Sequence, residues 1–89
     1  MANYVDKTLE KMDRAVARVK DFPRGGGCQM NAKAIAEARA CVSKAARACA
    51  EAYRVNMRDA FEVIETLCRD DSLAAAGEAS LELHNMIRR

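Results

Sequence analysis

The residues best placed for chemistry in this chain are the consecutive Arg24, Gly25, Gly26, Gly27 and Cys28. Backbone amides of a glycine-rich loop beside a helix N-terminus can bind an anion, and an arginine would add positive charge. The same charge would favour the reactive thiolate form of Cys28. The segment is not a P-loop, because GxxxxGK[ST] is absent and no strand is expected before it. We favour a turn between two helices, with an anion or thiol site as the alternative.

Four cysteines and one histidine are the remaining candidates for metal binding. Cys28, Cys41, Cys49 and Cys68 are separated by 13, 8 and 19 residues, and His84 lies far along the chain. Structural zinc sites draw their ligands from close pairs such as CxxC, which this chain lacks. We therefore predict no metal site and no cofactor. Within a helix such cysteines act as small apolar residues.

No group of titratable residues indicates catalysis. A histidine on a helical bundle can be a phospho-acceptor, but His84 lacks the lysine and glycine that typically follow the histidine of phosphotransfer domains. Glu62 with Glu65, and Asp70 with Asp71, are carboxylate pairs. We assign the first pair to an exposed polar stripe and the second to a helix cap. No Ser/His/Asp or Cys/His arrangement is present, so we expect a non-enzymatic protein.

The elements that would position these residues are helices. Residues 29–69 contain neither glycine nor proline, and eleven of the thirty residues 31–60 are alanine. This composition predicts one continuous α-helix over 29–69, roughly 60 Å long at about 1.5 Å per residue. Such a helix depends on partners along its length rather than on a compact core.

Two shorter helices are expected on either side of the long one. Apolar positions spaced by 4, 3, 4 and 3 residues predict a helix over 3–21, capped by Asn3; they are Val5, Leu9, Met12, Val16 and Val19. Steps of 3, 4, 3 and 4 predict another over 72–88; its positions are Leu73, Ala76, Ser80, Leu83 and Ile87. A glycine-rich turn at 22–28 separates the first helix from the long one.

These elements predict a single all-α domain over residues 1–89. Short connections make both shorter helices antiparallel to the long central helix, which gives an elongated three-helix arrangement. Each end then has only two helices in cross-section, so an apolar face is left uncovered. We expect a homo-oligomer, with coiled-coil packing, to complete the fold. The predicted interface residues on the long helix are Ile35, Val42, Tyr53, Met57, Phe61 and Ile64.

Charge is distributed unevenly along the long segment. The net charge of +2 is too balanced to indicate a nucleic-acid partner, although Lys44, Arg47, Arg54 and Arg58 form a basic stripe. Residues 33–58 carry six bases and two acids, whereas residues 59–71 carry five acids and one base. This order opposes the dipole of a single helix. We favour a mixed solvated face as the explanation; the alternative is an antiparallel dimer, in which two copies would set each positive half against a negative half.

The chain has no segment that indicates a membrane or secretory destination. The N-terminus lacks a basic region followed by an apolar one, and no run approaches the ~18 apolar residues of a membrane span. We expect no transmembrane segment and a cytoplasmic protein.

The second half of the chain contains a run from Tyr53 to Phe61 with Asn56 and the Ala60–Phe61 pair, then Leu67, then an expected last helix that starts at Ser72 and contains Glu78 and Glu82. In these features it is similar to phasins, small helical proteins that coat polyhydroxyalkanoate granules in bacteria. The likeness covers about 40 residues of the 89. The resemblance implies an apolar helical face that binds a hydrophobic surface or another subunit, and no catalytic residues.

Three hypotheses of function follow. The first is a non-catalytic interaction or scaffold protein that self-associates through the long helix. The second is a phasin-like protein that binds a hydrophobic surface. The third is a nucleic-acid-associated regulator, which we disfavour because the basic stripe has no recognition helix or aromatic platform beside it.

Overall fold

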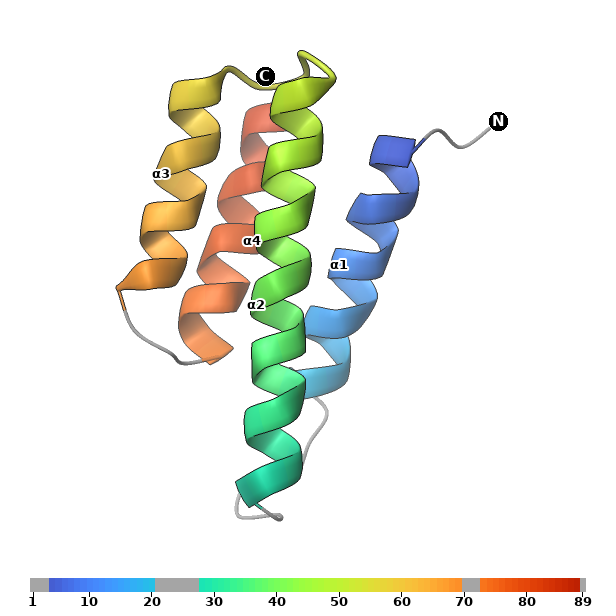
Figure 1. Cartoon of the computed structure of the whole chain (residues 1–89), viewed down its shortest axis with the longest axis vertical. Coiled ribbons are helices and arrows are strands. Elements are labelled where there is room, and N and C mark those ends of the chain that lie inside the picture. The colour runs from blue at the N-terminus through green and yellow to red at the C-terminus, as the bar shows by residue number, and fades with distance from the viewer. Residues whose placement is uncertain (1–3, 21–27, 70–72, 89) are drawn as a thin grey trace.

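The chain folds into four α-helices, in a computed structural model that describes residues 4–20, 28–69 and 73–88 (Figure 1). The helices are α1 (Tyr4–Lys20), α2 (Cys28–Glu51), α3 (Met57–Cys68) and α4 (Leu73–Arg88), and the described residues contain no strand. The predicted all-α class is confirmed. The predicted three-helix arrangement is wrong, because the segment 29–69 forms two helices instead of one.

The end of α2 explains why the long helix stops without glycine or proline. Tyr53 takes a positive φ of 59°. Its N–H donates to the carbonyl of Ala50 at 3.2 Å, and the N–H of Arg54 donates to the carbonyl of Cys49 at 2.9 Å. This pair of bonds around a left-handed residue is the Schellman motif, which satisfies the last carbonyls of a helix. Tyrosine occupies the position where glycine is usual.

The start of α3 is capped two residues later. Asn56 has extended backbone angles, and its side chain accepts a hydrogen bond from the N–H of Asp59 at 2.8 Å. Asp59 places a negative charge in the first turn, where the helix dipole favours it. Val55, just before the cap, is buried, as expected for an apolar residue that anchors a helix start. Residues 52–56 are therefore a well-bonded reversal between two helices.

The reversal makes α2 and α3 antiparallel neighbours within one molecule (Figure 1). The basic residues of α2 consequently lie beside a helix that carries Asp59, Glu62 and Glu65. The predicted long helix is thus divided into a basic α2 and an acidic α3 that are neighbours in one molecule. The molecule measures 40 × 31 × 17 Å, which is shorter than the predicted long helix alone.

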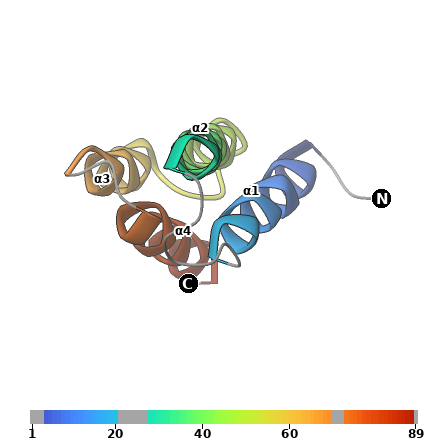
Figure 2. The same cartoon turned by 90° about the horizontal axis from the view of Figure 1, so that it is seen from below.

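The four helices pack as a flattened bundle (Figure 2). Helices α2 and α4 each contact all three others, whereas α1 and α3 lie on opposite sides and do not touch. The largest fully buried side chains are those of Met12, Leu83, Val42, Val63 and Cys49. Alanines fill much of the remaining core, so neighbouring backbones can approach closely.

The two outer predicted helices agree with the structure within the described residues. Helix α1 lies inside the range 3–21, and all five of its periodic apolar residues are buried. Helix α4 lies inside 72–88, with Ala76, Ser80 and Leu83 buried and Ile87 half-buried. The proposed cap at Asn3 lies outside the described residues. No helix among the described residues is both long enough and apolar enough to span a membrane.

Candidate functional site

The candidate site is an apolar groove between α2 and α3, on the face that these two helices share. Its volume is about 370 Å³. The lining residues come from the end of α2 and the first three turns of α3, and they are Arg47, Ala50, Glu51, Met57, Ala60, Phe61 and Ile64. Alanines form the floor of the groove, and the larger side chains form its α3 wall. The groove therefore offers a hydrophobic surface with charged residues only along the α2 side.

Helix α3 has apolar residues on two faces rather than one. Ala60, Val63, Thr66 and Leu67 are buried against the rest of the bundle. Met57 and Phe61 point outward and are 63% and 60% exposed, and Ile64 is half-buried. Together with the exposed Cys68, they recur at steps of 4, 3 and 4, which places them in one row along the helix. We refer to Met57, Phe61, Ile64 and Cys68 as the outer row.

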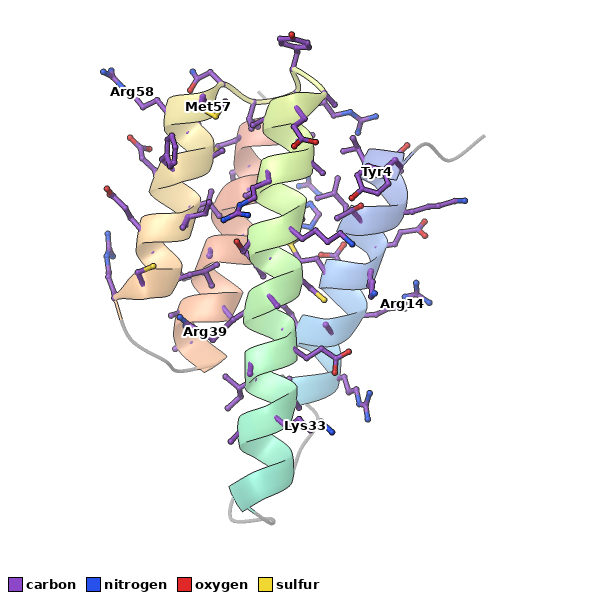
Figure 3. All side chains as sticks on the ribbon, in the orientation of Figure 1. Tyr4, Arg14, Lys33, Arg39, Met57 and Arg58 are labelled. Atoms are coloured by element: carbon purple, nitrogen blue, oxygen red, sulfur yellow. The ribbon has the colours of Figure 1, made fainter. Side chains whose placement is uncertain are left out.

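Charged residues flank the outer row on both sides. Arg58 projects from the side of α3 that faces away from α2 (Figure 3), and Glu65 follows it two helical turns later on the same side. On the α2 side, Arg47 and Glu51 line the groove. Within the described part of the chain, none of these four residues forms an ion pair. Two charges of each sign are thus available around one apolar surface.

Contacts outside the groove hold this surface in place. Arg54, in the reversal, donates to Asp6 of α1 at 2.8 Å, which ties the end of α2 to α1. On α3, the Thr66 hydroxyl lies 3.0 Å from Glu82 Oε2 of α4 and 3.1 Å from the carbonyl of Glu62. Both helices that form the groove are therefore fixed by polar contacts that leave the groove itself unobstructed.

The six predicted interface residues do not share one surface. Met57, Phe61 and Ile64 come together in the groove. Tyr53 is 95% exposed in the reversal, and Ile35 is half-buried on the first half of α2. Val42 is fully buried in the core and contributes to no surface.

Sequence reasoning missed four groove residues: Arg47, Ala50, Glu51 and Ala60. On a straight helix, Arg47 and Glu51 belong to the polar stripe and would lie far from Phe61. Only the reversal folds α2 back beside α3. The cap signal at Asn56 and the charge order that opposed a single helix dipole were the features that could have revealed the reversal.

The glycine-rich segment predicted as the alternative anion or thiol site lies mostly outside the described residues. Arg24 to Gly27 are not among them, and Cys28 begins α2 without a described side chain. The anion or thiol site there stays a prediction.

The other sulfur and nitrogen groups occupy structural positions. Burial raises the pKa of the Cys49 thiol, nearby Arg54 lowers it by a smaller amount, and Asp6 adds to the increase. Cys41 is half-buried. His84 Nε2 lies 2.7 Å from Asp13 Oδ1 and so links α4 to α1. Within the described part of the chain, no three His, Cys, Asp or Glu residues gather closely enough to hold a metal ion.

The four residues of the predicted basic stripe are dispersed. Lys44 and Arg47 remain on α2, but Arg54 turns to Asp6 of α1 and Arg58 projects from the outer side of α3. The four residues therefore do not lie along one helix, as the prediction of a single long helix had placed them.

Compared with protein-family models, curated proteins and solved structures, this chain matches none. We therefore infer its function from the geometry of the groove.

Proposed function

We propose that this chain is a non-catalytic helical interaction protein that self-associates by burying the α2–α3 groove against the same groove of a second copy. The observation that carries the proposal is the exposure of Met57 and Phe61 above an alanine floor. Met57 and Phe61 do not fill the core of their own molecule, whereas Ile64 packs partly against it. The exposed apolar area of Met57 and Phe61 becomes buried only when another surface covers it.

Covering the exposed part of Met57 or Phe61 would stabilise an assembly by about 1–2 kcal/mol for each side chain. In a symmetric dimer each contribution occurs twice, because both copies present the same surface. The half-buried Ile64 adds further area. Together these contributions offset only part of the cost of association, about 4–15 kcal/mol, so a stable dimer also requires the area of Ile64 and the charged residues around the groove.

The first test is sedimentation velocity across about 1 to 100 µM protein, where a self-associating chain changes its mean mass with concentration. Phe61→Asp places a charge in the groove and should yield a folded monomer. Leu81→Asp is the matched control, since Leu81 is 62% exposed but lies on α4, outside the groove. It should associate like the unaltered chain.

Two results would overturn the proposal. One is an unaltered chain that stays monomeric at about 100 µM. The other is equal loss of association in both aspartate variants, which would mean that the groove has no special role. Circular dichroism of each variant separates loss of association from loss of fold.

Binding to a hydrophobic surface, as the phasin resemblance implies, is the second candidate. The observation that favours it is that large exposed side chains also occur away from the groove: Tyr4, Tyr53 and Leu81. A surface-coating protein would use several of them at once. It would partition onto hydrophobic particles, and Leu81→Asp would then weaken binding as Phe61→Asp does.

A further inference from the structure

We infer that the two copies pack with α3 antiparallel to α3 of the partner, so that Arg58 of each copy faces Glu65 of the other. This inference rests on the proposed self-association and specifies its geometry. The outer row would form the centre of the contact, and the unpaired charges around it would form the rim.

The spacing of the outer row supports a helix-to-helix contact. Met57, Phe61, Ile64 and Cys68 step by 4, 3 and 4 residues, which is the pattern of a two-helix seam with an apolar residue at every a and d position. In an antiparallel pair centred between Phe61 and Ile64, Phe61 meets the partner's Ile64. Met57 then meets the partner's Cys68. Each large residue is therefore matched with another apolar residue.

The flanks of the seam favour the antiparallel direction. On the flank toward the bundle core, the positions are Ala60 and Leu67, and both are buried within their own molecule. On the outer flank they are Arg58 and Glu65, and neither has an ion-pair partner among the described residues. An antiparallel pair places the outer flank of one α3 against the outer flank of the other. A parallel pair would place the outer flank of one α3 against the core-facing flank of the other. Only the antiparallel pair brings Arg58 to the partner's Glu65.

The charged residues on the α2 side of the groove are also arranged so that those of one copy complement those of the other. Glu51 lies next to the reversal and so is level with Arg58, while Arg47 lies one turn further down α2. A two-fold axis that crosses the seam would bring each Arg47 toward the partner's Glu51. The exposed residues further along α2 include Ala36 and Ala40, whose small side chains let the partner approach.

A competing two-fold arrangement places α3 of one copy over α2 of the other. It would set Arg58 near the partner's Glu51 and is also compatible with the charges. It buries less apolar area, however, because α2 presents alanine and charged residues where α3 presents Met57, Phe61 and Ile64. We therefore assign the contact to α3 against α3.

Charge reversal distinguishes the two arrangements. Arg58→Glu and Glu65→Arg should each weaken the dimer roughly tenfold, because each replaces two attractions with two repulsions. The double variant restores both attractions in the α3–α3 arrangement and should recover the original dissociation constant. With α3 over α2, the same double variant would dissociate further than either single variant.

Cross-linking provides an independent measurement. In a background with Cys28→Ser and Cys41→Ser, Met57→Cys would place a thiol beside the partner's exposed Cys68. Oxidised glutathione should then produce a covalent dimer, and adding Cys68→Ser should abolish it. Without the change at Met57, the two Cys68 residues would lie far apart, so little covalent dimer is expected. A parallel seam would instead cross-link Cys68 to Cys68 directly.

The outcomes separate this inference from the proposed function. Suppose that Phe61→Asp abolishes association, but that the charge-reversed double variant still dimerises weakly and position 57 does not cross-link to Cys68. Self-association is then supported and the antiparallel α3 seam is wrong. If the unaltered chain never associates, the proposed function itself is wrong. Rescue by the double variant together with the specific cross-link supports both.

Discussion

Helices α1 and α3 lie on opposite sides of the bundle and use their apolar residues differently. All five periodic apolar residues of α1 face inward, and its exposed side carries charges such as Lys7, Glu10 and Arg14. Helix α3 buries one apolar face and exposes another, which contains Met57 and Phe61. Helix α1 closes the core, while α3 both closes the core and offers a surface. An apolar side chain that does not stabilise its own fold is the best indication of a contact outside it.

The strongest way to sharpen this comparison is to truncate one methionine on each helix. Met12 is fully buried on α1, and Met12→Ala should lower the free energy of unfolding by about 2–5 kcal/mol. Met57→Ala, on the outer row of α3, should lower it by about 0.5 kcal/mol or less when the protein is dilute. Urea denaturation of both variants at low concentration measures the difference. Equal losses would show that the outer row belongs to the core.

A smaller effect is expected at the cap that orients α3. Asn56→Ala removes the side chain that accepts the Asp59 N–H and should lower the free energy of unfolding by about 0.5–2 kcal/mol. It should also weaken self-association, since the groove requires α3 to lie beside α2. Asn85→Ala on α4 is the control, because Asn85 is exposed and caps no helix. An Asn56 variant with unaltered stability would mean that packing alone positions α3.

The smallest expected effect is at Tyr53. A non-glycine residue with a φ of 59° carries a strain of about 1 kcal/mol, which glycine avoids. Tyr53→Gly should therefore raise the free energy of unfolding by up to about 1 kcal/mol, partly offset by the greater entropy of glycine in the unfolded chain. Thermal unfolding followed by circular dichroism measures the change. A clear loss of stability would instead reveal a contact that the exposed tyrosine ring makes.

Periodicity was sufficient to predict the parts of the fold where one face is apolar. Helix α1 illustrates this, because its spacing alone identifies every apolar residue that the structure buries there, although it does not identify the buried Thr8. Prediction failed at residues 52–56, since alanine, tyrosine, arginine, valine and asparagine all tolerate a helix and none forbids one. The reversal depends on Asn56 as a cap and on tertiary packing, and the second of these has no local pattern.

The site could be predicted only in part for the same reason. A straight helix places Val42 and Met57 on similar faces, so both were assigned to one interface. The reversal sends Val42 into the core and leaves Met57 outside. Exposure is a property of the whole bundle, and no pattern in the residues around Val42 reveals it.

The reversal at residues 52–56 also determines how this chain can exchange parts with a copy of itself. None of its residues prevents a helix, so straightening it would join α2 and α3 into the single helix that alanine content favours. Such a chain would carry α3 and α4 away from α1, and a second chain straightened in the same way could supply the missing pair. The strained φ of Tyr53 lowers the cost of opening this hinge. The contacts of α3 and α4 with α1 and α2 would then form between two chains, so the reversal is what keeps them within one molecule.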